Sequence, residues 1–128
     1  MIVKEITYED YRGNIRTDKF HFNLSKAELM EMEASEDGGL SARLQQIVDS
    51  QSAPEIMKVF KSFILKSYGV VSPNGVSFIK DPEATRAFEQ SEAYSELLLE
   101  LLNDADKAAA FINGIVPSSI ANQIPKQD

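Results

Sequence analysis

The sequence predicts an α+β fold, mostly α-helical, with an N-terminal antiparallel β-hairpin followed by about five to six helices in one compact domain. Apolar and polar residues alternate in the first 24 residues, as in a strand, whereas later apolar residues recur every three or four positions, as in a helix. A chain of 128 residues, 43% of them hydrophobic, has the size of one domain. We expect a single globular domain over residues 1–117, with the hairpin at 2–24, the helical part at 25–117 and a polar, mobile tail at 118–128.

The hairpin is predicted from two alternating segments, residues 2–8 and 20–24. Between them, Asp10, Gly13 and Asn14 are residue types that tolerate the backbone angles of tight turns. A hairpin alone is only marginally stable in water. We therefore expect helices to cover one of its faces.

The first helix has a distinct start signal. Ser25 and Glu28 have the spacing of a capping box, in which each side chain accepts a hydrogen bond from the other residue's backbone N–H. Leu24 and Leu29 are placed to form a hydrophobic staple across the same turn. The helix is expected to run until the paired glycines at 38 and 39.

The later elements are predicted from the same periodicity and from capping residues, namely Ser52, Asp81 with Pro82 after it, and Asp104. Helices are expected near 40–49, at 53–68 with Gly69 at its end, from 82 through 88, over 94–102, and from about 106 to 113 with Gly114 as its stop. Around residues 90–91 the chain either continues the helix or caps a new one. Residues 70–72 and 76–79 flank a Pro-Asn-Gly turn, which predicts a small second hairpin.

Apolar residues continue past the predicted stop at Gly114. Branched residues beside a proline are an unusual exposed ending, so they should be buried either against the same chain or against a partner. Both readings stay open. As a hypothesis, the closing segment and one face of the preceding helix contribute to self-association or to partner binding. The residues are Tyr94, Leu98, Leu101, Phe111, Ile112, Ile115 and Val116.

The charge and composition exclude several classes of function. A net charge of −7 without any cluster of Lys or Arg argues against binding to nucleic-acid phosphates. The absence of Cys excludes disulfides and thiolate chemistry. No apolar run approaches the roughly 20 residues that span a bilayer, and the first residues lack the build of a signal peptide. We expect no nucleic-acid or membrane partner and a cytoplasmic location.

No pattern in the chain indicates catalysis or ligand chemistry. His21 is the single histidine, and its strand position places it on the solvent side without a group to orient it as a base. The acidic residues lack the spacing of a calcium loop, and Asp104 and Asp106 are explained as helix-start acids. No glycine-rich phosphate loop is present. We therefore expect no enzyme activity, no cofactor and no metal.

Taken together, the segments of this chain resemble one protein family. They include residues 4–11 (KEITYEDY), 20–29 (FHFNLSKAEL), 78–83 (FIKDPE), 91–97 (SEAYSEL) and 111–117 (FINGIVP), with shorter pieces at 38–40, 47–49 and 58–61. In this order they resemble tail assembly chaperones from long-tailed phages and prophages of Gram-positive bacteria. The resemblance covers nearly the whole chain up to Pro117.

The resemblance implies a role without catalysis. Such chaperones bind the long helical tape-measure protein, keep it soluble and help tail-tube subunits polymerise around it. It implies action in the host bacterial cytoplasm and absence from the mature virion. In the family, a programmed frameshift commonly gives a longer form as well.

The alternative from another class is a small acidic inhibitor or adaptor, for example an anti-defence protein that mimics nucleic-acid charge. Such a mimic needs its carboxylates gathered on one surface. Here the acids are distributed along nearly every predicted helix with Lys and Arg among them. This distribution favours the chaperone.

Overall fold

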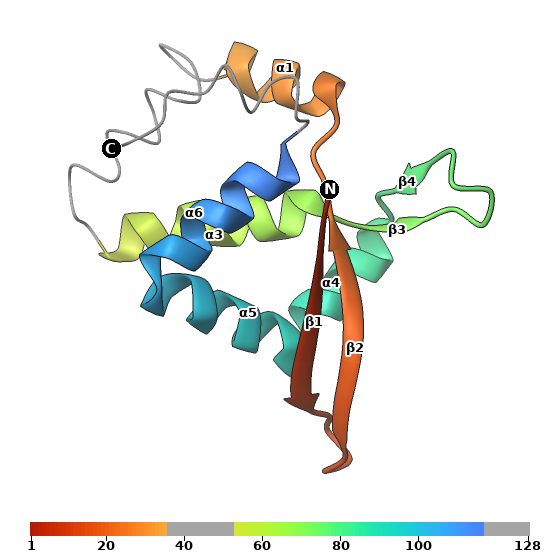
Figure 1. Ribbon diagram of the computed structural model, residues 1–128, viewed down its shortest axis with the longest axis vertical. Helices are drawn as coiled ribbons and strands as arrows, with labels where there is room; N and C mark the ends of the chain where they lie inside the picture. Colours follow the sequence, from red (N-terminus) through yellow and green to blue (C-terminus); the bar gives the residue numbers. More distant parts are fainter. Residues whose placement is uncertain (36–52, 117–128) are drawn as a thin grey trace.

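The computed structural model describes residues 1–35 and 53–116. The predicted helix near 40–49, the cap at Ser52 and the tail at 118–128 lie outside this range. The strands and helices, in chain order, are β1 (Ile2–Glu9), β2 (Ile15–Phe22), α1 (Lys26–Ser35), α3 (Ala53–Ser67), β3 (Tyr68–Val71), β4 (Phe78–Ile79), α4 (Pro82–Glu89), α5 (Glu92–Asn103) and α6 (Ala105–Ile115) (Figure 1).

The strands form one antiparallel sheet in the order β1-β2-β3-β4. The predicted N-terminal hairpin is confirmed, with pairing from Ile2 opposite Phe22 to Glu9 opposite Ile15. Its second strand begins earlier than predicted and ends before Leu24, which is buried beyond the strand. The predicted second hairpin is also present, and it joins the first because β3 pairs with the last two residues of β2. The α+β class is thus confirmed, with a larger sheet than expected.

The turn of the first hairpin is held by the side chain of Asp10. Its carboxylate accepts the backbone N–H groups of Arg12 and Asn14, each at 2.9 Å. These hydrogen bonds, the one to Asn14 above all, lower the pKa of Asp10. Gly13 supplies a φ of +84°, which few other residues adopt. The turn lies at the opposite end of the molecule from α1 (Figure 1).

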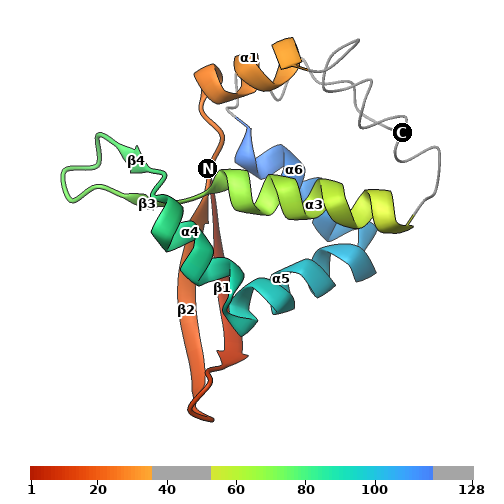
Figure 2. The ribbon, with the colours of Figure 1, turned by 180° about the vertical axis from the view of Figure 1, so that it is seen from behind.

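Helices cover one face of the sheet, where α5 and α6 pack on β1, α3 on β2 and α4 on β3 (Figures 1 and 2). Ile6 and Phe22 point into this layer and are buried. The opposite face carries Glu5, Thr7 and Lys19, all exposed. This alternation is the expected pattern of a sheet with one buried face.

Aromatic rings connect the sheet to the helices. Tyr68 of β3 stacks on Phe88 of α4 with ring centroids 4.5 Å apart, and burial raises the pKa of Tyr68. Phe22 meets Phe88 at 5.7 Å and Phe111 of α6 at 5.3 Å, both edge-on. The buried hydrophobic residues form one core cluster. A single domain over residues 1–117 stays a prediction, because part of that range lies outside the described residues.

The predicted helix starts have the expected hydrogen bonds. The Ser25 hydroxyl accepts the Glu28 N–H at 3.1 Å, and the Glu28 carboxylate accepts the Ser25 N–H at 2.9 Å, which completes the capping box. Asp81 and Asp104 are the N-caps of α4 and α6. At residues 90–91 the chain breaks the helix and starts α5, with Ser91 at the N-cap position. Local capping chemistry therefore fixes the starts of α1, α4 and α6, whereas Ser91 makes no side-chain cap hydrogen bond.

Two glycines do not end helices as predicted. Gly69 lies inside β3, where the ring of Phe78 occupies the space of a side chain, 2.6 Å from the position of a Cβ atom. Gly114 lies inside α6, which continues to Ile115, and a Cβ atom there would be 3.0 Å from Cδ1 of Ile2. Neither glycine has a positive φ. They are needed for close approach and not for a left-handed helix end.

The contact between Gly114 and Ile2 gives a testable expectation for stability. Replacing Gly114 with Ala should bring little gain in the native chain, because the added methyl group crowds Ile2. In an Ile2→Ala background the same change should stabilise by about 0.5–1 kcal/mol, the helix preference of Ala over Gly. Urea unfolding of the four proteins in this double-mutant cycle measures the difference. An equal effect of Gly114→Ala in both backgrounds would show that crowding against Ile2 does not offset the helix preference of Ala.

Candidate partner-binding site

The structure divides the seven predicted partner-binding residues into two groups. Four are in the core: Leu101, Phe111, Ile115 and Val116, each at most 5% exposed. Tyr94, Leu98 and Ile112 are half-buried and pack against that core from outside. Only these last three retain surface that a partner could touch in this conformation. Partner binding by this segment stays a prediction.

Ile115 and Val116 are buried against the same chain. The carbonyl of Ile115 accepts the backbone N–H of Leu24 at 2.6 Å. Beside it, Gly114 lies against Ile2, and Phe111 meets Phe22. The closing segment therefore closes the core against the hairpin and the start of α1.

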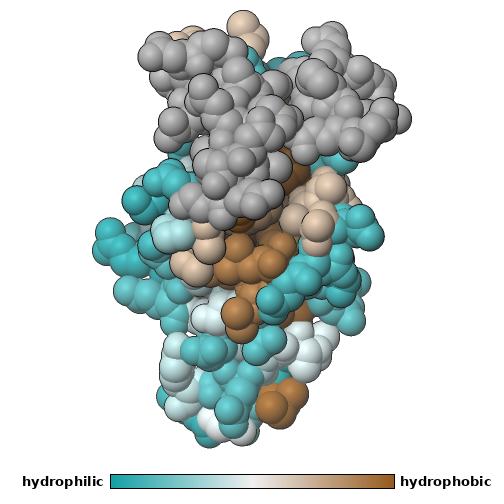
Figure 3. All heavy atoms as spheres, turned by 90° about the vertical axis from the view of Figure 1, so that its left-hand side faces the viewer, coloured by the Kyte–Doolittle hydropathy of each residue, from teal (hydrophilic) through white to brown (hydrophobic). Residues whose placement is uncertain are grey.

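The outer side of α3, α5 and α6 carries apolar surface. Figure 3 shows apolar side chains gathered in one central area of this side, with hydrophilic surface beside and below it. Met57 of α3 and Leu99 of α5 are 47% and 54% exposed. Tyr94 of α5 is half-buried, burial raises its pKa and the Lys61 ammonium acts in the opposite direction. We call Tyr94, Leu98 and Ile112 the helical face.

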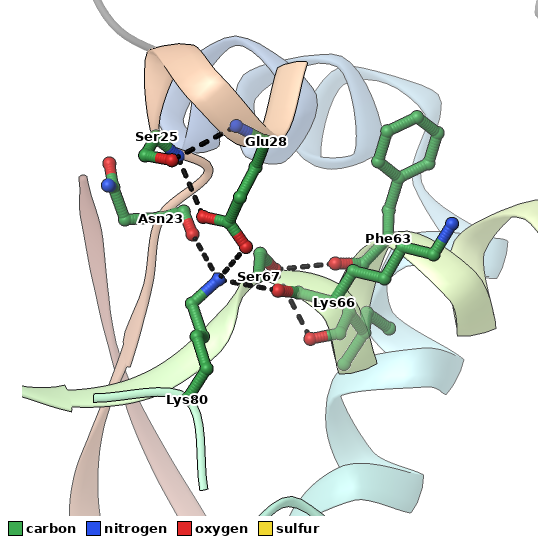
Figure 4. A network of polar contacts seen from close by, with 8 residues as sticks. Asn23, Ser25, Glu28, Phe63, Lys66, Ser67 and Lys80 are labelled. Atoms are coloured by element: carbon green, nitrogen blue, oxygen red, sulfur yellow. Dashed lines mark hydrogen bonds and ion pairs between the residues drawn. The ribbon is translucent and has the colours of Figure 1, made fainter. Parts of the chain in front are cut away.

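The ammonium group of Lys80, just before α4, connects three separate segments (Figure 4). It donates to the carbonyl of Asn23 at 3.0 Å, to the Glu28 carboxylate at 2.8 Å and to the carbonyl of Lys66 at 2.6 Å. A lysine has three N–H donors, so all are used. The contact with Lys66 places the positive charge at the carbonyl end of α3, where the helix dipole favours it. Lys80 thus joins α1 to α3 and α4.

The end of α3 has a second polar link to the segment before α1. Ser67 is fully buried, and its hydroxyl donates to the carbonyl of Phe63 at 2.5 Å. The carbonyl of Ser67 accepts the N–H of Asn23 at 2.7 Å. Among the described residues, no buried side-chain nitrogen or oxygen lacks a hydrogen-bond partner. The buried polar side-chain atoms around Lys80 are therefore engaged within the chain.

A groove of about 610 Å³ opens beside this network. Residues of α1 form one wall, residues of α4 form the other, and the end of α3 and the segment before α1 contribute the rest. Its described lining residues are Leu24, Glu28, Glu31, Met32, Leu65, Lys66, Lys80, Pro82, Thr85, Arg86 and Glu89. We call this the α1–α4 groove.

Sequence reasoning did not find the groove. Its walls come from segments more than 50 residues apart, as the pairing of Lys80 with Glu28 shows. Pro82 and Glu28 were recognised as helix-start residues, but capping signals are local and do not tell which helices face one another. A lysine directly before an N-cap Asp carries no signal of a long-range contact. Only the folded arrangement shows it.

Several ion pairs join acidic and basic side chains of different elements. Glu100 of α5 pairs with Lys4 of β1 at 3.0 Å and with Lys107 of α6 at 3.4 Å. Glu89 of α4 pairs with Lys61 of α3 at 3.3 Å. These carboxylates belong to separate elements and are each matched by a base. Such an arrangement does not build the one-sided acidic surface of a nucleic-acid mimic.

The described residues were compared with the requirements of a metal site and of a membrane-spanning helix. Across residues 1–35 and 53–116, no group of three or more His, Asp or Glu side chains is placed to hold a metal ion. His21 is half-buried on the sheet face opposite the helices, paired with Val3 and Gly69 in the neighbouring strands. None of the helices in the same residues combines the length and apolar character that crossing a membrane requires.

Loss of the Lys80 ammonium should destabilise the protein. In Lys80→Met the two carbonyls and the Glu28 carboxylate lose a charged donor, which should cost about 1–3 kcal/mol of unfolding free energy. Lys58→Met, at an exposed position of α3, is the matched control and should change stability by less than about 0.5 kcal/mol. Urea denaturation measures both. Equal stability of the two variants would show that Lys80 does not hold α1.

The contact between Lys80 and Glu28 should also affect the pKa of Glu28. Burial raises the pKa of Glu28, but hydrogen bonds from Lys80 and Ser25 outweigh it, so the pKa lies below the ordinary value of 4.5. A lowered pKa in the folded state stabilises above that ordinary value, and the stabilisation is lost as pH falls through the folded pKa. Residue-specific NMR titration should therefore show a higher pKa of Glu28 in Lys80→Met. Asp10, whose pKa is set by its own turn, serves as the internal control and should not move.

Comparison with known protein families identifies this chain's family. The sequence model of a family described as phage tail assembly chaperone matches residues 1–128. A search of curated proteins finds no match, and no solved structure matches. Because the family match extends over the full sequence, the chain belongs to the phage tail assembly chaperone family.

Proposed function

We propose that this protein binds the tape-measure protein of its phage, keeps it soluble and helps recruit tail-tube subunits around it. The family membership carries the proposal. The surface supports it, since the described part of the chain offers partly exposed apolar side chains on helices and a groove between helices. These are the features that bind amphipathic helices. The protein would act in the host cytoplasm without catalysis and would be absent from the finished virion.

The helical face is proposed to contribute to self-association or to contact with the tape-measure protein. Tyr94, Leu98 and Ile112 rest on the core and still expose part of their side chains. Such residues can bury further apolar area on binding without first unfolding the protein, which buried residues cannot do. The four buried members of the predicted set would support this face from beneath.

No contact among the described residues favours the alternative function of an acidic inhibitor or adaptor. Its carboxylates would have to present one continuous negative surface. Instead Glu89 and Glu100 lie in ion pairs with lysines of neighbouring elements. The negative net charge fits a protein that must stay soluble while it exposes apolar surface.

Co-expression tests the proposed function directly. The tape-measure protein encoded by the same phage should move into the soluble fraction when this chain is produced with it, and the two should co-purify. An unrelated small domain of equal negative charge is the control, because it separates binding from a general effect of charge. If the tape-measure protein is equally soluble alone, with the control and with this chain, the proposal is wrong.

A further inference from the structure

We propose that the β3–β4 hairpin is a self-association surface, at which β4 pairs antiparallel with β4 of a second copy of this chain. The hairpin projects from the side of the molecule, away from α5 and α6 (Figures 1 and 2). It exposes the apolar side chains of Val70, Val71, Val76 and Ile79. This surface is separate from the helical face. The inference goes beyond the proposed function, because it concerns two copies of this chain and not the tape-measure protein.

The outer edge of β4 has backbone groups that an added strand can use. The sheet order β1-β2-β3-β4 places no strand of the described residues beyond β4. The N–H of Ser72 donates to the carbonyl of Ser77 at 2.8 Å, so the backbone groups of Ser77 point towards β3. These groups alternate along a strand, and those of Phe78 therefore point to the outer edge. No hydrogen bond with another described residue occupies them there.

The absence of charge on the hairpin favours a second copy as the occupant. No Asp, Glu, Lys or Arg lies between Lys66 and Lys80, in a chain with a net charge of −7. In a two-fold symmetric pair, each residue near the axis lies beside its own copy, so a charged edge would bring like charges together. The other outer strand, β1, carries Lys4, Glu5 and Glu9, and such charges keep edge strands from pairing. Of the two outer strands, β4 alone lacks this protection.

The alternation of backbone groups also sets the register of the pair. With Phe78 opposite Phe78 of the second copy, the two residues exchange both of their backbone hydrogen bonds. Two residues further out, Val76 lies opposite Lys80 of the second copy. The N–H of Val76 already donates to the Asn74 side chain at 3.1 Å, which leaves its carbonyl for the Lys80 N–H. A helix has its own backbone groups bonded internally and could not use this edge.

Apolar side chains would meet on both faces of the paired strands. On one face, Ile79 lies diagonally across from its own copy, with Val70 beside it in β3. On the other face, the Phe78 ring lies beside its own copy, with Val71 next to it. β-Branched and aromatic side chains are the types that pair well across strands. Because the strand is short, the dimer should be weak and dependent on concentration.

Sedimentation equilibrium over a series of concentrations tests the proposal with the chain alone. The average mass of the native chain should rise from that of one chain towards that of two. Val76→Lys brings a positive charge next to Lys80 of the second copy and should weaken association by about tenfold or more. Leu99→Lys is the matched control, since it makes the same exchange at an exposed position of α5, and it should stay within about twofold of native. Val76 is 81% exposed, so its replacement should leave the fold intact.

Two further measurements locate the interface. The amide signal of Phe78 should shift with protein concentration in NMR spectra of the native chain, whereas the amide of Gly13, in the distant first turn, should not. Added salt should strengthen association, because it screens the repulsion between two chains of net charge −7. An interface held by ion pairs would respond in the opposite way.

Selective loss of association in Val76→Lys, together with the shift of the Phe78 amide, supports the inference. A native chain that stays monomeric at every concentration overturns it, as does native-like association of Val76→Lys. Loss in Leu99→Lys alone also overturns it and assigns self-association to the outer side of the helices. Association that weakens with salt contradicts an uncharged interface. No tape-measure protein is used, so failure here leaves the proposed chaperone function standing.

Discussion

The burial of Phe22 is the constraint on which the rest of the structure depends. This ring is fully buried at the end of β2, and it contacts Tyr68 of β3, Phe88 of α4 and Phe111 of α6. A single side chain of the hairpin thus meets elements that begin 46 or more residues later. A hairpin alone would be marginal, so these ring contacts explain how it becomes part of a stable sheet. They also fix where α4 lies, and with it one wall of the groove.

The segment that follows Phe22 determines where α1 lies, and α1 forms the other wall of the groove. Two residues after Phe22, Leu24 is fully buried and its N–H is bonded to the carbonyl of Ile115. The next residue, Ser25, caps α1, so the helix starts at a point held by both the core and the closing segment. Lys80 then fixes the first turn of α1 through Glu28. Met32, farther along α1, packs against the core and lines the groove.

The sequence predicted those features that depend on neighbours along the chain. The Ser25 capping box, the caps at Asp81 and Asp104 and the turn at Asp10 and Gly13 all involve residues at most four apart, and all were found. The prediction that Gly69 and Gly114 end helices was wrong. A glycine can be required either for a positive φ or for the close approach of another side chain, and only the fold brings Phe78 and Ile2 next to these two glycines. Lys80 and the α1–α4 groove were missed for the same reason.

The apolar closing segment shows why burial and function cannot be separated by hydrophobicity alone. Ile115 and Val116 are as apolar as any anchor for a partner, yet they close the core, whereas Met32 and Thr85 looked unremarkable and line the groove. The two groups differ in whether their apolar surface is already buried within the chain. Phe111, Ile115 and Val116 have buried their surface within the chain, so binding a partner there would first require opening the core. Tyr94, Leu98 and Ile112 still expose part of their side chains, so further apolar area can be buried there without opening the core.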